Sequence, residues 1–195
     1  MISGVEKLDV TNPDVQHFII EACASSKIPN KEHEHNYTKE NFLRQFAENR
    51  FDIGFFLVRH EGRPLAFFGL SNHEQNWIVA SRLIHLENVR HNFLWGAGGL
   101  YILPFLDQTY SNKYAGVFFC MNGTKTIATA LFRRLRTKQQ NNQRHPLDSY
   151  TLLPYTVLYR GVEQTVLYKA FDASAGVPPL RKHKDIEWNL YQEKV

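Results

Sequence analysis

The chain has 195 residues, of which 43% are hydrophobic and 22% are charged, a balance that fits one globular domain and excludes a wholly disordered chain. Its longest mainly apolar stretch, residues 94–106, is too short for a bilayer span, which needs about 20 residues, and the N-terminus lacks the pattern of a secretory signal. Two cysteines, Cys23 and Cys120, are too few to staple a domain of this size, so we expect reduced thiols in a cytoplasmic protein.

The positive charge is concentrated in one segment. The formal net charge is +4, yet six basic residues and no acidic residue lie between positions 125 and 144. Such a segment on a nearly neutral body favours a local anion site over a general nucleic-acid surface. A solvated helix end explains the same charges, because basic residues complement the dipole at a helix C-terminus. Both interpretations remain open.

Two helices are predicted near the start of the chain. Residues 13–25 place apolar side chains at helical spacing behind Pro13, which suits a first helical turn. Residues 26–37 form a polar loop. Thr38 then caps a second helix over roughly residues 38–50, with Phe42 and Phe46 on one side.

From residue 53 the spacing of apolar side chains changes from the helical period to that of strands. Residues 53–60 and 65–71 are predicted as a hairpin around a turn at 61–64, and residues 77–89 as a third strand. A glycine-rich segment, Trp95 to Gly99, leads into an apolar helix that ends near Tyr110.

The second half alternates in the same way. A buried strand over residues 114–121 precedes a helix over 122–136, and two strands over 150–159 and 162–171 are joined by Arg160 and Gly161. Residues 1–172 are therefore expected to form one domain and residues 173–195 a C-terminal appendage. This order predicts an α/β fold, with a mixed, mostly antiparallel twisted sheet and helices on both faces.

Two segments carry a resemblance to a known superfamily. One runs from the strand LIHLENV through RHNFLWGAGG into an apolar helix (residues 83–106), and the other is a strand ending at Asn122 with a helix behind it (residues 114–135). With the element order over residues 1–171, they resemble the GCN5-related N-acetyltransferase (GNAT) superfamily. The resemblance implies acyl transfer from acetyl-coenzyme A (acetyl-CoA), the cosubstrate, to an amine.

The glycine-rich segment is the predicted coenzyme site. Glycines at a strand-to-helix turn expose backbone N–H groups, and the helix N-terminus adds partial positive charge for a diphosphate. The predicted cofactor-binding residues are Val89, Arg90, Trp95, Gly96, Ala97, Gly98, Gly99 and Asn122. The alternative is that these glycines serve only a tight turn.

Catalytic groups are predicted beside this turn. His85 and Glu87 lie two apart on the preceding strand and so face the same way. The resemblance implies His85 first and Glu87 second as the base that deprotonates the amine. No motif places the acid for the leaving thiolate, and the candidate hydroxyls are Tyr114, Tyr101 and Tyr155. The alternative is a His–Glu pair on a sheet surface. Cys120 is interpreted as inert packing because no base is tied to it.

The first inter-helix loop is a candidate acceptor site. His33 and His35 flank an acidic residue there, and the resemblance places this loop at the border of the substrate site. A solvated loop is the leading interpretation, acceptor contact the second and a metal the third, so no metal is predicted. The expected partner is a small-molecule or peptide amine, no membrane contact is expected, and a homodimer stays open.

Departures from the superfamily pattern support alternatives. Phe93 and Leu94 stand where a Gln or Arg is usual, and Phe132 stands where a tyrosine often protonates the thiolate. A catalytically inactive GNAT-fold module for binding or assembly is therefore the second hypothesis. A nucleic-acid-binding module using the basic residues at 125–144 is the third, placed last because no recognised nucleic-acid motif occurs.

Overall fold

The computed structural model describes residues 4–25, 38–86, 97–121, 129, 131 and 145–188, and the fold is given for these residues. The α-helices are α1 (Pro13–Ser25), α2 (Lys39–Ala47) and α3 (Ala97–Tyr110). The strands are β1 (Val5–Leu8), β2 (Gly54–His60), β3 (Arg63–His73), β4 (Trp77–His85), β5 (Gly116–Met121), β6 (Thr151–Leu152), β7 (Tyr155–Tyr159), β8 (Val162–Ala170) and β9 (Lys182–Asp185).

The strands form one nine-stranded sheet in the order β1-β2-β3-β4-β5-β8-β7-β9, with β6 paired to β8 outside this path. Only β4 and β5 pair in parallel; the other described pairs are antiparallel. A parallel pair needs a crossover, and α3 lies in that connection. The predicted mixed, mostly antiparallel sheet is confirmed.

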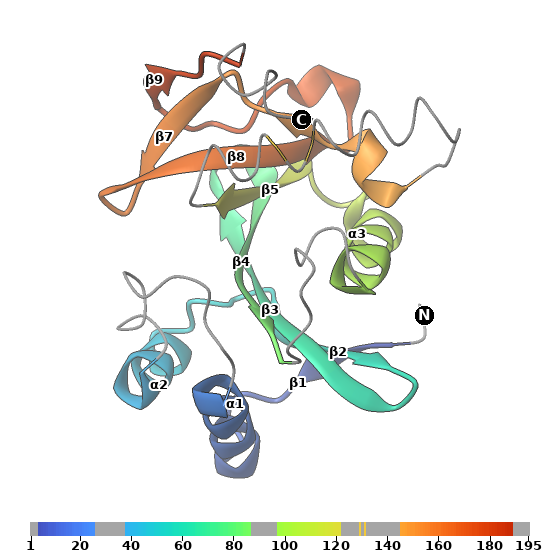
Figure 1. Cartoon of the computed structure of the whole chain (residues 1–195), viewed down its shortest axis with the longest axis vertical. Coiled ribbons are helices and arrows are strands. Elements are labelled where there is room, and N and C mark those ends of the chain that lie inside the picture. Colours follow the sequence, from blue (N-terminus) through green and yellow to red (C-terminus); the bar gives the residue numbers. More distant parts are fainter. Residues whose placement is uncertain are drawn as a thin grey trace.

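Helices cover both faces of the sheet, as predicted (Figure 1). On the α3 face one continuous core joins α3 to strands from both halves of the sheet, with Phe56, Ile102 and Phe119 fully or nearly fully buried in it. The opposite face carries two separate cores. One packs α1 and α2 on β2 and β3 around Phe42 and Phe55, and the other lies over β4, β5, β7 and β8.

The two N-terminal helices begin where their sequences predict. The Asp14 backbone N–H donates to Asn12 Oδ1 (2.9 Å) at the start of α1. The Asn41 backbone N–H donates to Thr38 Oγ1 (3.3 Å), which makes Thr38 the N-cap of α2. These side chains satisfy N–H groups that lack an intrahelical partner.

Three boundaries differ from the sequence-based expectation. The edge strand β1 was not predicted, because a four-residue strand with a single buried side chain, Leu8, has no clear alternation. The strand expected over residues 150–159 is broken between β6 and β7 at Leu153 and Pro154, since proline has no N–H to donate to a ladder. β3 continues to His73, and a 3₁₀ turn, η2 (Glu74–Asn76), follows it.

α3 accommodates a proline in its interior. The helix is assigned over its whole length with Pro104 inside it, so it begins well before the proline. Proline leaves the carbonyl of Leu100 without its usual helical donor. The Leu100 side chain is 51% exposed, which places this turn of the helix at the protein surface.

The C-terminal segment adds to the sheet. β9 pairs with β7 through Tyr155 and Asp185, at the sheet edge. Two further short turns are η3 (Pro146–Ser149) and η4 (Ala173–Ala175). The helix predicted over residues 122–136 lies outside the described residues except for Thr129 and Leu131, which are helical. No helix within the described ranges has the length and apolarity needed to cross a membrane.

Candidate functional site

The parallel strands β4 and β5 separate along their length. Residues Trp77–Ala80 of β4 pair with Gly116–Phe119 of β5, and this is the whole of their described pairing. Beyond these residues β4 continues as a partner of β3, up to the pairing of His85 with Ala66, and β5 continues with β8, up to Met121. The sheet therefore opens between the carboxyl ends of its two central strands.

A β-bulge lies where β4 leaves β5. Phe67 pairs with Ile84 and Gly69 pairs with Ser81, so β4 has one more residue than β3 over this interval. Arg82 lies in the bulge with a φ of 53°. A bulge bends its strand and increases the local twist, which gives a physical reason for the divergence of β4 from β5.

The predicted residues that the structure describes lie at the ends of these elements. His85 is the last residue of β4, and Ala97, Gly98 and Gly99 are the first residues of α3, so the glycines begin the helix. The other predicted residues lie outside the described part of the chain: Glu87, Val89, Arg90, Trp95, Gly96, Asn122, His33 and His35.

Tyr114 lies away from the strand opening. It precedes β5, its backbone N–H donates to the Tyr110 carbonyl oxygen (3.1 Å), and its ring packs on the Tyr110 ring at 5.8 Å. Because β4 and β5 are parallel, the start of β5 lies beside the start of β4, whereas His85 ends β4. The structure therefore does not bring Tyr114 and His85 together.

Cys120 lies on β5 just past the last residue paired with β4. Burial raises the pKa of its thiol to about 12, and the charge of Arg160 opposes this only in part. The thiol is protonated at neutral pH, which supports its interpretation as packing rather than as a nucleophile.

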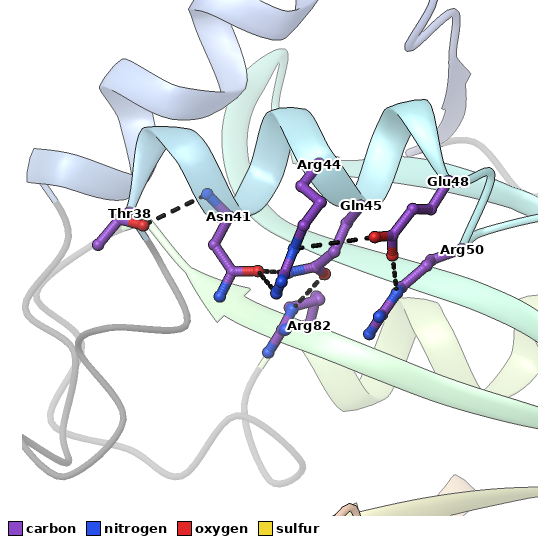
Figure 2. A network of polar contacts seen from close by, with 7 residues as sticks. All are labelled: Thr38, Asn41, Arg44, Gln45, Glu48, Arg50 and Arg82. Carbon is purple, nitrogen blue, oxygen red and sulfur yellow. Dashed lines mark hydrogen bonds and ion pairs between the residues drawn. The ribbon is translucent and has the colours of Figure 1, made fainter.

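A polar network connects α2 to the bulge (Figure 2). Arg82 Nε donates to Gln45 Oε1 (2.9 Å), and Gln45 Nε2 donates to Asn41 Oδ1 (2.9 Å). Gln45 is only 1% exposed, so its amide is a buried anchor for the guanidinium. At the C-terminal end of α2, Glu48 bridges Arg44 (3.9 Å) and Arg50 (2.6 Å).

Two residues of the β7–β8 hairpin share this electrostatic environment. Burial raises the pKa of the Tyr159 phenol, and the positive charges of Arg160 and Arg82 oppose that rise. The Arg160 guanidinium carbon lies 5.3 Å from the centre of the Tyr159 ring.

Sequence analysis did not identify Gln45, Arg82, Tyr159 or Arg160 as site residues. One signal was present, an arginine inside the apolar strand sequence WIVASRLIH. Within residues 4–25, 38–86, 97–121 and 145–188, no group of three His, Cys, Asp or Glu side chains is placed to hold a metal ion.

Comparison with known proteins gives structural likenesses. No protein-family model matches the sequence, and no curated protein is significantly similar to it. A PaiA N-acetyltransferase from Thermoplasma acidophilum in complex with coenzyme A matches 85% of this chain and 97% of its own length, with 11% identity and a TM-score of 0.52.

Two aminoglycoside-modifying enzymes are similar to the same extent. An aminoglycoside 6′-N-acetyltransferase complexed with coenzyme A matches 86% of this chain and 97% of its own, with 11% identity and a TM-score of 0.53. An aminoglycoside N-acetyltransferase of the Ib11 type matches 88% and 97%, with 8% identity and a TM-score of 0.55. At these identities the likeness concerns the fold, and the chain is a divergent example of the GCN5-related N-acetyltransferase fold.

Proposed function

We propose that the chain is an acyl-coenzyme A-dependent N-acyltransferase. The observation that carries this proposal is the separation of β4 from β5 after Ala80 and Phe119. An extended pantetheine arm has amide groups that can hydrogen-bond to strand backbone, as an added strand does. The opening between two strands that otherwise pair is suited to such an arm.

The diphosphate of the coenzyme is proposed to bind at Gly96–Gly99. The helix α3 begins at Ala97, so its first N–H groups lie in this segment and have no intrahelical acceptor. Arg90 and Trp95 precede the glycines, and Asn122 follows β5, so both loops at this end of the parallel pair would contact the coenzyme. Two solved structures of the same fold contain coenzyme A.

In the proposed reaction the amine nitrogen attacks the thioester carbonyl carbon. The carbonyl oxygen gains negative charge, which the Val89 backbone N–H would stabilise. His85, or Glu87 after it, would accept the proton lost by the attacking ammonium group. Collapse of the tetrahedral intermediate breaks the carbon–sulfur bond and releases the coenzyme thiolate, which then takes up a proton. The products are an amide and free coenzyme A.

The acceptor is a small-molecule or peptide amine, and His33 and His35 are proposed to border its site. Tyr114 remains a proposed acid, although its place at the start of β5 does not favour that role. A tyrosine acid is not essential, because a coenzyme thiolate is a fairly good leaving group. We place the protein in a reducing compartment such as the cytoplasm, since Cys23 and Cys120 form no disulfide.

Calorimetric titration with acetyl-CoA tests the proposal, followed by measurement of thiol release across a panel of amines. We expect saturable binding and amine-dependent release of coenzyme A. Failure to bind at millimolar coenzyme would contradict the proposal. Gly98→Asp, which adds a negative charge at the diphosphate site, should weaken binding, whereas Glu74→Asp on the distant turn η2 should not.

The second candidate function is a GNAT-fold module that binds without catalysis. Phe132, and Phe93 with Leu94, favour it, since these positions usually carry polar groups in the superfamily. Coenzyme binding without thiol release from any amine would support this function. Nucleic-acid binding through residues 125–144 is the third candidate, and it predicts an affinity that falls steeply with salt.

A further inference from the structure

The proposed coenzyme site has two parts, which lie on different elements. The diphosphate part is the start of α3 at Ala97, and the pantetheine part is the opening between β4 and β5 past Ala80 and Phe119. One coenzyme molecule binds both parts well only if α3 is held at a fixed place relative to the strands on each side of the opening. The contacts that fix α3 to the two halves of the sheet, β1 to β4 and β5 to β9, therefore influence coenzyme binding.

α3 is attached to the first half of the sheet by a hydrogen bond and by aromatic packing. Tyr101 Oη and His60 Nδ1, at the end of β2, lie 2.7 Å apart. The Phe105 ring centre lies 5.3 Å from that of Phe56 on β2 and 6.0 Å from that of Phe68 on β3. These contacts fix the helix to the strands that precede the opening (Figure 1).

An ion pair attaches α3 to the second half of the sheet. Lys169 Nζ, from β8, lies 2.5 Å from Asp107 Oδ2. The two side chains are 22% and 31% exposed, so the pair is mostly shielded from solvent. No other ion pair between described residues involves α3. Lys169 also pairs in the sheet with Val117, a β5 residue that belongs to the parallel contact with β4.

Tyr150 connects this ion pair to the strand opening. Lys169 Nζ lies 5.6 Å from the centre of the Tyr150 ring, and the Tyr150 ring packs edge-on to the Phe119 ring at 5.9 Å. Phe119 is the last β5 residue that pairs with β4. Contacts therefore run from Asp107 on α3, through Lys169 and Tyr150, to the residue at which the two strands separate.

An ion pair at this place sets position more than stability. It borders the apolar core under α3, which includes Leu106 and Tyr150. In such surroundings a charged pair often stabilises a protein no more than apolar side chains of similar volume, yet either charge is costly without the other. A shift of α3 by one helical turn, about 5.4 Å, would separate the two charges, whereas apolar contacts adapt to such a shift.

We propose that Asp107 and Lys169 are positioning residues for the coenzyme. Their ion pair holds α3 at the place where its first N–H groups and the strand opening bind one molecule together, and the Tyr150 ring supports Lys169. Neither charged side chain touches the coenzyme or the amine. This inference rests on the proposed acyltransferase function and names residues outside the site that set its geometry.

The test compares the whole coenzyme with a fragment that reaches only one part of the site. Calorimetry on the full chain measures the affinity for coenzyme A and for adenosine 3′-phosphate 5′-diphosphate, which lacks the pantetheine arm. Asp107→Asn removes the negative charge and Lys169→Met removes the positive charge, each with little change of shape. We expect each variant to bind coenzyme A about tenfold more weakly and the fragment as tightly as the parent chain, because only the whole coenzyme depends on the relative position of the two parts.

Further variants separate positioning from stability. The double variant Asp107→Asn, Lys169→Met should lose no more coenzyme affinity than the weaker-binding single variant, since both changes break one interaction. Lys169→Arg keeps the charge and should retain most of the affinity. Asp185→Asn is the matched control, because Lys182 and Asp185 form an ion pair of the same residue types at 2.6 Å on the exposed strand β9. Circular dichroism and denaturation midpoints establish that each variant is folded at the temperature of the titration.

The outcomes distinguish this inference from the function on which it rests. Unchanged coenzyme affinity in folded Asp107→Asn or Lys169→Met overturns the inference alone, as does an equal loss for the coenzyme and the fragment. A parent chain that binds coenzyme A but not the fragment also overturns it, because the start of α3 would then not hold the diphosphate. Absence of coenzyme binding by the parent chain removes the proposed function and the positioning role together.

Discussion

Both cysteine thiols are held in the protonated form by burial. The pKa values of Cys23 and Cys120 are raised to about 12, from the 9.0 of an exposed thiol. At pH 8 the thiolate fraction is on the order of one in ten thousand. We expect native protein to react with a disulfide reagent far more slowly than protein unfolded in urea. Rapid labelling of native Cys120 would contradict this and reopen its role as a nucleophile.

Gly116 begins β5 at a point where a side chain does not fit. An added Cβ would meet the Trp77 ring and lie 2.5 Å from the Lys169 carbonyl oxygen, both in the packed centre of the sheet. Gly116→Ala should lower the free energy of unfolding by about 1–3 kcal/mol or more through overpacking. Gly62→Ala, at an open turn with φ +79°, is the comparison and carries only backbone strain. Equal denaturation midpoints for the two variants would contradict the packing argument.

At the scale of elements, the cap of α2 can be tested separately from its packing. Thr38→Ala removes the oxygen that accepts from the Asn41 N–H, so we expect a loss of about 1 kcal/mol in urea denaturation. Thr38→Ser keeps the hydroxyl and should lose little. An equal loss for both variants would mean that the threonine methyl group, rather than the cap, stabilises the helix.

Elements with strong local signals were predictable from the sequence. Pro13 and Thr38 predict the starts of two helices, and Arg160 with Gly161 predicts the turn between β7 and β8. The structure contains both helix starts and the turn. β1 depends on which strand lies alongside, which local pattern does not encode. The break at Pro154 follows from a local signal, the missing proline N–H, which the strand predicted over residues 150–159 did not take into account. The bulge at Arg82 depends on pairing with β3. The separation of β4 from β5 could therefore not be predicted from the sequence of β4 alone.

The candidate site was predicted less completely, for a related reason. His85 and the glycines before α3 were predicted together because they lie close together in the sequence, and the structure places His85 at the end of β4 and Ala97 to Gly99 at the start of α3. Gln45 and Arg82 come from α2 and β4, and only the folded sheet brings them together. Their residue types alone are typical of any surface, so no single segment indicates a site.

At the scale of the whole molecule, stability should decline in alkali. Burial raises the pKa values of Cys23, Cys120 and Tyr110 to about 12, against 9.0 for the thiols and 10.0 for the phenol when exposed. The unfolded chain loses these protons first, so their contribution is complete below about pH 9 and is lost as pH rises toward 12. Denaturation midpoints measured across this range should fall.

A control identifies the groups responsible for the alkaline decline. The double variant Cys23→Ala, Cys120→Ala has no thiols to ionise and should lose stability with pH less steeply than the parent chain, whatever its starting stability. Identical slopes for the two proteins would mean that other groups cause the decline.

The parallel contact between β4 and β5 is a seam of four residues on each strand. Among the residues that the structure describes, the cores over α1, α2 and the C-terminal half do not join across this seam, and only the core under α3 bridges the two halves. Local opening should therefore begin at this seam, and amide protons of Ile78 to Ala80 should exchange with solvent sooner than those deep in β2 or β8. A bound coenzyme would contact both halves of the sheet and slow that exchange. The amide protons at this seam should therefore show the largest change in exchange rate when the coenzyme binds.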